Sequence, residues 1–186
     1  MRMDSRLHSI KRVASRYKNS KYQNDSITIE LNKGRYINSR ANLGVILLKD
    51  DDFMGHCEAH VATYTLEEMG RGHFVCADDI EKLSQEYWFE DELLRYDDSK
   101  DELAVLVVEV IDSGLDSSLQ GKRCGLQMYV QLVRAAFLEH GRLPLLFMPN
   151  YCHDKSTSDQ ALRVWKSFAK KYHSEGDVIV IDSTPN

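Results

Sequence analysis

The chain has 186 residues, of which 42% are hydrophobic and 28% charged, and its formal net charge is −5 at pH 7. This length and composition predict one ordinary soluble globular domain with a substantial core, alone or with a small appendage. No apolar run approaches the roughly 20 residues that a membrane-spanning helix needs, and the N-terminal segment lacks the apolar stretch of a secretory signal. We therefore expect a cytoplasmic protein whose four cysteines (Cys57, Cys76, Cys124 and Cys152) are reduced thiols.

The charge is distributed unevenly along the chain. Residues 1–22 contain seven Lys or Arg and one Asp. Their apolar residues recur at helical spacing, which predicts a basic N-terminal helix appended to a main domain over residues 23–186. Because no aromatic interleaving or known DNA-binding motif accompanies this charge, a solvated helix is favoured over a nucleic-acid contact. Residues 50–102 contain 17 Asp or Glu and four Lys or Arg, which is either solvated surface or a preference for a cationic substrate such as an amine.

The first half of the main domain reads as strands followed by helix. Alternating apolar residues predict a strand over 26–31, ended by Lys33 and Gly34, and a second strand over 42–49. Three aspartates at 50–52 predict a turn, after which residues 53–64 return as an antiparallel strand. The apolar spacing over 78–96 predicts one or two helices.

The second half alternates strand and helix. A Val-rich apolar run at 103–111 predicts a strand buried on both faces. A helix is predicted over 125–140, with Leu126, Tyr129, Val130, Val133, Ala136 and Phe137 on its apolar face and Gly141 as its stop. A short strand over 143–148, a helix capped by Ser158 or Asp159 and a last strand over 177–182 follow. The order implies a parallel strand–helix–strand unit with a right-handed crossover. The expected fold is a single α/β (α+β) domain with a mixed, mostly antiparallel sheet.

The most informative segment, Gln120-Gly121-Lys122-Arg123-Cys124-Gly125, joins the buried strand to the helix that follows it. The first N–H groups of a helix have no partner inside it, and the helix dipole adds partial positive charge at this end. Lys122 and Arg123 add two full charges at the same place. The segment therefore predicts a site for an anion, such as a phosphorylated ligand.

This segment resembles the signature motif of the GNAT superfamily of acyl-CoA-dependent N-acyltransferases, in which Gln/Arg-x-x-Gly-x-Gly/Ala follows a strand and opens a helix. Such loops commonly read Arg/Gln-Gly-Lys-Gly-Ile-Gly, and the matching positions here are Gln120, Gly121, Lys122, Cys124 and Gly125. The downstream order of elements also agrees, so the resemblance covers roughly residues 100–182. Arg123 stands at the motif's central glycine, where the backbone must avoid positive φ or accept strain. The connection from Val110 to Gln120 is also longer than the family norm.

The resemblance implies a GNAT-like fold and acetyl-CoA or another acyl-CoA as the cofactor. The pyrophosphate would lie on the amides of residues 121–125, with Gln120 at the start of the loop. The pantetheine arm would pair with the strand backbone near Glu109, Val110 and Ile111, and a backbone N–H near Val110 would polarise the thioester carbonyl. Asn150 would hydrogen-bond the pantetheine, or is simply a turn residue after Pro149.

Acyl transfer to an amine also requires a general base, because a protonated amine is not nucleophilic. Glu109 is the first candidate, since it is the only ionisable residue inside the apolar run. Alternatively, its side chain simply reaches solvent or an arginine. Asp112, just beyond the run, is the second choice.

The family's usual acid for the departing thiolate is a Tyr in a pattern like Ala-x-x-Leu-Tyr. The corresponding residue here is Trp165, in Ala161-Leu162-Arg163-Val164-Trp165, and its indole has no acidic proton to give. Tyr151 is therefore the predicted acid, with Cys152 and Tyr172 as further candidates.

Two other chemistries are less favoured. The spacing Cys57-x2-His60-x12-His73-x2-Cys76 has the ligand types of a structural zinc site. In a strand, however, Cys57 and His60 would point to opposite faces, so no metal is predicted. A covalent mechanism through Cys124 or Cys152 lacks a His and a carboxylate at a fixed local spacing.

The leading functional hypothesis is an acyl-CoA-dependent N-acetyltransferase in which a primary amine attacks acetyl-CoA directly within a ternary complex. The amine belongs to a protein, an aminated sugar or a small polyamine. The alternative is a catalytically idle CoA-binding or protein-interaction module of the same fold. A third hypothesis is a nucleic-acid-associated factor led by residues 1–22. Membrane and nucleic-acid partners are not expected, and a homodimer is left open.

Overall fold

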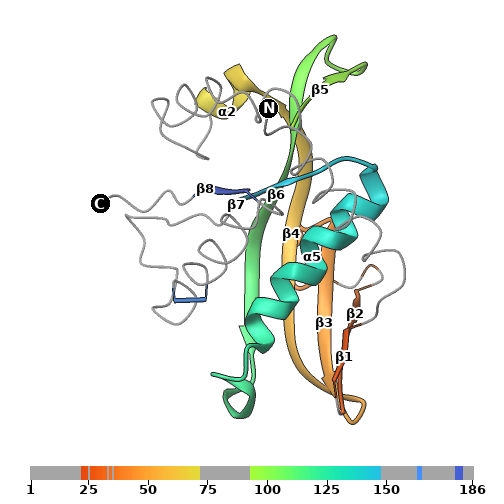
Figure 1. Cartoon of the computed structure of the whole chain (residues 1–186), viewed down its shortest axis with the longest axis vertical. Helices are drawn as coiled ribbons and strands as arrows, with labels where there is room; N and C mark the ends of the chain where they lie inside the picture. Colours follow the sequence, from red (N-terminus) through yellow and green to blue (C-terminus); the bar gives the residue numbers. More distant parts are fainter. Residues whose placement is uncertain are drawn as a thin grey trace, which may run out of the picture.

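A mixed eight-stranded sheet is the framework of the computed structural model, which describes residues 22–24, 26–32, 34, 36–71, 93–147, 163–164 and 179–181 (Figure 1). The strand order is β1-β2-β3-β4-β6-β7-β8, and β5 pairs with β6 beside this path. The first four strands form an antiparallel meander: β1 (Tyr22–Asn24), β2 (Ile27–Leu31), β3 (Leu43–Lys49) and β4 (Asp52–Thr65).

The remaining strands surround the long strand β6 (Glu102–Leu115), which pairs antiparallel with both β4 and β5 (Leu94–Asp97). Along the edge opposite β4, β6 pairs with β5 at residues 102–105 and, further on, in parallel with β7 (Leu145–Phe147), which in turn pairs in parallel with β8 (Ile179–Ile181). Helix α5 (Cys124–His140) connects β6 to β7, and the short helix α2 (Leu66–Arg71) follows β4. The sequence-based expectation of a mixed, mostly antiparallel sheet with one parallel strand–helix–strand unit is confirmed, and the fold is α+β.

Local sequence explains where β4 begins and where α5 ends. Asp50 and Asp51, between β3 and β4, both have positive φ (51° and 69°), as a two-residue hairpin turn requires. Gly141 ends α5 in the left-handed conformation, and its N–H donates to the Phe137 carbonyl at 2.8 Å. Both the turn and the helix stop were predicted from the sequence.

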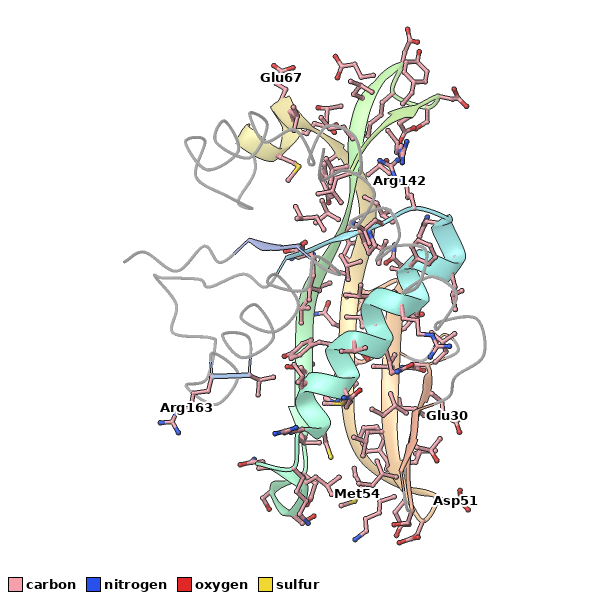
Figure 2. All side chains as sticks on the ribbon, viewed as in Figure 1. Glu30, Asp51, Met54, Glu67, Arg142 and Arg163 are labelled. Carbon is pink, nitrogen blue, oxygen red and sulfur yellow. The ribbon has the colours of Figure 1, made fainter. Side chains whose placement is uncertain are left out.

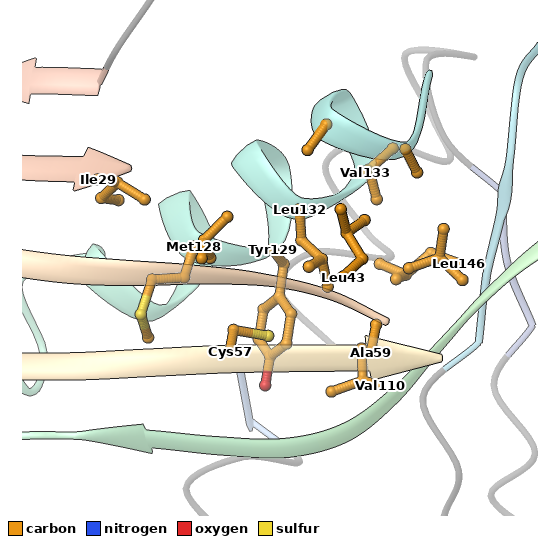
Figure 3. Close-up of a cluster of buried hydrophobic side chains, with 14 of the residues drawn as sticks. Ile29, Leu43, Cys57, Ala59, Val110, Met128, Tyr129, Leu132, Val133 and Leu146 are labelled. Atoms are coloured by element: carbon orange, nitrogen blue, oxygen red, sulfur yellow. The ribbon is translucent and has the colours of Figure 1, made fainter. Parts of the chain in front are cut away.

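Helix α5 covers one face of the sheet, and the core lies between them (Figure 3). The helix contributes Met128, Tyr129, Leu132 and Val133, and the strands contribute Ile29, Val45, Cys57, Ala59 and Val110. The predicted apolar face of this helix was right for Tyr129, Val133 and Ala136, which are buried, but omitted Met128 and Leu132. Leu126, Val130 and Phe137 are only partly buried.

Strand β6 extends beyond the predicted limit at residue 111. Residues 112–115 were predicted to be loop because they are mostly polar, but they continue to pair with residues 55–58 of β4. The register shifts between Ala59↔Val110 and Glu58↔Asp112, which leaves Ile111 as an extra residue, a β-bulge. Cross-strand pairing with a long partner therefore outweighs the polar composition of this segment.

The helix predicted over 78–96 was wrong at its C-terminal end, where residues 94–97 form β5. These residues form a hairpin with β6, in which Leu94 pairs with Val105 and Asp101 in the turn has φ 55°. Because this pairing requires extended backbone, residues 94–97 are strand and not helix. Helix α2 was not predicted, although the sequence contains a capping box: the Glu68 N–H donates to Thr65 Oγ1 (3.1 Å), and the Thr65 N–H donates to Glu68 Oε2 (2.8 Å).

Some predicted elements lie outside the described residues. These are the basic helix up to residue 21, residues 78–92, and the helix after Ser158 apart from Arg163 and Val164, which are helical. Tyr22, assigned to the basic helix, belongs instead to β1. Among the described helices, none combines the length and the apolar character needed to cross a bilayer.

Candidate functional site

The loop between β6 and α5 lies at the same end of the sheet as the β3–β4 turn, which Asp51 and Met54 mark in Figure 2. The Asp116 N–H donates to the Met54 carbonyl at 2.8 Å, and the Asp116 carboxylate accepts the Ser118 N–H. A short 3-10 helix (Ser117–Leu119) then places Leu119 in the core, where it is 1% exposed. The loop is therefore anchored just before its charged segment.

Residues 120–123 of this loop are exposed, and two of them have positive φ: Gly121 at 75° and Arg123 at 64°. Arg123 is the N-cap of α5, and its side chain makes no capping hydrogen bond. Within the described part of the chain, no backbone carbonyl accepts the N–H groups of Cys124, Gly125 or Leu126. The segment thus combines outward helix amides with two exposed cationic side chains, which is the chemistry of an anion site.

The other glycine of the loop, Gly125, is half-buried. A Cβ atom added there would lie 3.6 and 3.7 Å from the two methyl groups of Val164, which is ordinary van der Waals contact. Val164 is helical and packs against the core cluster. Residues 120–123 are therefore exposed, whereas Gly125 adjoins a second segment.

Arg123 has a positive φ of 64°, a left-handed conformation that strains a residue with a Cβ atom. We expect Arg123→Gly to raise the free energy of unfolding by about 1 kcal/mol, because a non-glycine residue in the left-handed region costs roughly this much. Arg123→Ala is the matched control: it removes the same charge but keeps a Cβ atom, so it should give no comparable gain. Urea denaturation of the three proteins measures the difference, and equal stability of the two variants would contradict the strain.

The second part of the predicted site is the edge of β6 that faces β7. Only Val107–Glu109 pair with β7 among the described residues, while β6 continues to Leu115. The bulge at Ile111 follows directly, and the Val110 side chain points into the core, where it is 4% exposed. The main chain of Val110 and Ile111, which the resemblance implies as the contact of a pantetheine arm, therefore lies just beyond the parallel pairing.

Glu109 lies on the sheet face opposite α5, because its neighbours Val108 and Val110 point into the helix-covered core. It is 5% exposed, and its Oε2 atom lies 3.7 Å from Nη2 of Arg40. The alternative in which this carboxylate meets an arginine is therefore observed. His60 is its cross-strand neighbour on β4, and its Nδ1 atom lies 3.2 Å from the Arg40 carbonyl oxygen.

Arg40 reaches Glu109 because residues 36–42, between β2 and β3, are anchored to β4. Glu58, 1% exposed, accepts the N–H groups of Ile37 (2.7 Å) and Asn38 (2.8 Å), one on each carboxylate oxygen. The Asn42 side chain accepts the Val61 N–H and donates to the Val61 carbonyl. We refer to His56, Glu58, His60, Tyr64, Glu109, Asp112 and Arg40 as the polar face.

Tyr64 was not predicted as a site residue, although it is close enough to Glu109 and Arg40 to feel both charges. Burial raises the pKa of its phenol, the Glu109 charge adds to this, and the Arg40 charge opposes it. The phenol therefore stays protonated at neutral pH and is a proton donor. This placement could have been predicted from the sequence, because side chains alternate along a strand and residues 56, 58, 60 and 64 of β4 therefore share one face of the sheet.

Asp112, the second candidate base, lies 3.3 Å from His56 Nε2. The imidazole stacks on Phe53 and lies over Gly114, where an added Cβ atom would come within 2.8 Å of the ring. Asp112 is thus part of an Asp–His pair on the polar face. Glycine at position 114 makes room for the ring.

The cysteines of the described residues do not form a metal or nucleophilic centre. Cys57 lies in the core and His60 on the opposite face, so the two cannot bind one zinc ion, while His73 and Cys76 lie outside the described residues. Burial raises the pKa of the Cys57 thiol, and it also raises that of Cys124 against the opposing charge of Lys122. Buried protonated thiols are poor nucleophiles.

The predicted acid Tyr151 and the predicted pantetheine contact Asn150 lie outside the described residues, as do Cys152, Trp165 and Tyr172. Comparison of the chain with protein families, with curated proteins and with solved structures found no match. The case for a function therefore rests on the geometry of the loop, the β6 edge and the polar face.

Proposed function

We propose that the protein is an acyl-CoA-dependent N-acyltransferase of the GNAT type, with acetyl-CoA as the expected donor. The observation that carries the proposal is the exposed loop between β6 and α5, where helix amides, Lys122 and Arg123 gather at the start of the helix. A diphosphate carries charges that match this cationic end of the helix. Gln120 and the amides from Gly121 onward are the proposed contacts.

The β6 edge supports the same proposal for the rest of the cofactor. The pantetheine arm is an extended amide chain, and it can pair with strand backbone as an added strand does. The bulge at Ile111 leaves one residue of β6 outside the ladder with β4. A main-chain N–H at Val110 or Ile111 is the proposed donor to the thioester carbonyl.

The polar face supplies the acid–base groups. Glu109 takes a proton from the acceptor's ammonium group, and the resulting amine attacks the thioester carbonyl carbon. The new C–N bond forms and the C–S bond breaks. The nitrogen then loses its second proton, which neutralises the leaving thiolate, directly or through a tyrosine, and gives CoA thiol. Glu109 then releases its proton to solvent. Tyr64 on β4 joins Tyr151 as a candidate donor to the thiolate, since its phenol is protonated.

Calorimetric titration with acetyl-CoA tests the proposal most directly. We expect acetyl-CoA to bind, and acetyl-pantetheine, which lacks the pyrophosphate, to bind at least tenfold more weakly, a difference of about 1.4 kcal/mol. Equal affinities would show that the loop does not recognise the diphosphate. No binding of either compound would remove the transferase proposal.

Replacing Glu109 with glutamine should lower kcat on the order of 100-fold, because general-base catalysis contributes at least this much. The affinity for acetyl-CoA should stay unchanged. Glu102→Gln, at the exposed start of the same strand, is the matched control. Unaltered turnover in Glu109→Gln would exclude this residue as the base.

The idle CoA-binding module remains the second candidate, and one observation favours it: Arg40 already occupies the neighbourhood of Glu109. A module of this kind binds acetyl-CoA but does not transfer the acetyl group. Measurement of CoA thiol release in the presence of amines separates the two candidates.

A further inference from the structure

The side chain of Phe53, near the start of β4, lies outside the core although regular alternation along the strand would bury it. Cys57 points into the core beneath α5, and an unbroken strand would turn Phe53 to the same side. The register of β4 with β3 shifts between Leu47 and Leu48, which leaves Met54 as an extra residue, a β-bulge. Met54 packs against the core, whereas Phe53 points toward the polar face and is 59% exposed.

The Phe53 ring is held in place without being covered. It stacks on the imidazole of His56, with 6.1 Å between the ring centroids and 17° between the ring planes. This separation is typical of an offset aromatic pair. His56 is itself fixed, because its Nε2 atom lies 3.3 Å from Asp112 and its ring lies over Gly114. The exposed surface of the Phe53 ring is therefore a firm, flat and apolar platform for a second planar group.

This platform adjoins the loop that carries the cationic segment. The Met54 carbonyl, next to Phe53, accepts the Asp116 N–H at 2.8 Å. The chain then makes two successive turns, in which the Leu119 N–H donates to Asp116 (3.0 Å) and the Lys122 N–H donates to Leu119 (3.3 Å). Each such turn brings its end Cα atoms within about 7 Å, so Lys122 lies within about 14 Å of Asp116. A nucleoside diphosphate can span this distance.

The charges on the two sides of Phe53 favour one orientation of such a ligand. On one side are the exposed Lys122 and Arg123 of the loop. On the other side is the β3–β4 turn, with three exposed aspartates at residues 50–52 (Asp51 is labelled in Figure 2). Phosphate groups are attracted by the loop and repelled by the turn. The base, which is planar and uncharged, is the part that can lie on Phe53.

We propose that Phe53 binds the adenine base of the cofactor by stacking, while the diphosphate lies on the amides of residues 121–125. This inference rests on the proposed acyl-CoA site and adds the residue that recognises its nucleotide. Stacking on an aromatic ring tolerates different bases, because every base has a π-face. The recognition therefore depends on a flat ring at position 53 rather than on hydrogen bonds to the edge of the base.

Calorimetric titration of Phe53 variants with acetyl-CoA tests the inference. We expect Phe53→Ala to weaken binding about fivefold or more, since removal of an aromatic platform costs at least this much. Phe53→Leu keeps an apolar side chain but no flat ring, and it should lose affinity as Phe53→Ala does. Phe53→Trp should retain the affinity of the natural protein. Unchanged affinity in Phe53→Ala, or full affinity in Phe53→Leu, would overturn the inference.

Tyr96→Ala is the matched control, because Tyr96 on β5 is an aromatic residue of similar exposure, 57%, away from the loop. It should bind acetyl-CoA as the natural protein does, and an equal loss in Tyr96→Ala and Phe53→Ala would also contradict stacking at Phe53. If acetyl-CoA binds the natural protein and all Phe53 variants alike, the base lies elsewhere and the diphosphate site stands. If acetyl-CoA does not bind the natural protein, the proposed function itself fails.

Discussion

Gly125→Glu is expected to abolish binding of acetyl-CoA, lowering its affinity by at least 100-fold. The new carboxylate would lie in the first turn of α5, beside the amides proposed to bind the pyrophosphate, and the two anions would repel each other. Two factors of ten correspond to about 2.8 kcal/mol, which is a modest repulsion for charges a few ångströms apart at a partly buried site. Calorimetric titration of the variant with acetyl-CoA measures the loss.

The control for this variant has to match the added volume, because Gly125 adjoins Val164. Gly125→Gln introduces a side chain of the same length without the charge. We expect it to bind acetyl-CoA more weakly than the natural protein but clearly better than Gly125→Glu. If both variants bind equally, the effect is steric, and if both bind as the natural protein does, the diphosphate is not at this loop.

Glu58→Ala should lower the free energy of unfolding by about 3 kcal/mol or more. Its carboxylate accepts two backbone N–H groups, hydrogen bonds to a charged group contribute roughly 1.5–3 kcal/mol each, and the substitution would leave both donors without their acceptor. Urea denaturation measures the loss. Hydrogen exchange at the amides of Ile37 and Asn38 should accelerate more than exchange in α5, because these residues lose their anchor to β4.

Two substitutions test the specificity of this effect. Glu58→Gln keeps one carbonyl acceptor and should lose about half as much stability as Glu58→Ala. Glu30→Ala removes a partly exposed glutamate from β2, labelled in Figure 2, and should change stability by less than about 1 kcal/mol. An equal loss from Glu30→Ala and Glu58→Ala would contradict the anchoring role of Glu58.

The sequence predicted the elements that carry a strong local pattern. The β3–β4 hairpin and helix α5 each have a regular apolar period bounded by aspartates or by Gly141, and both were predicted within one or two residues of their ends. The parallel β6–α5–β7 unit followed from the order of strand, helix and strand. The candidate anion-binding loop was predicted for the same reason, because Gly121, Lys122 and Arg123 stand at a boundary between two clear patterns.

The parts that the sequence did not predict depend on contacts between distant segments. Residues 112–115 are polar, and only pairing with the end of β4 makes them strand. Arg40 has no local feature that marks it, and its approach to Glu109 depends on Glu58 binding the preceding backbone. The capping box of α2, by contrast, is a local signal in Thr65 and Glu68 that sequence inspection can find.

The single extra residue in β6 has a consequence for the chain beyond it. Inward and outward positions alternate along a strand. Without the bulge, the pairing of β6 with β4 would have turned Asp112 toward Tyr129 and the apolar core. Ile111 resets this parity, so that Ser113 meets the Tyr129 hydroxyl at 3.1 Å and Asp112 turns outward to His56. One inserted residue thus allows a hydrophobic strand to continue into polar sequence without burying an acid beneath the helix.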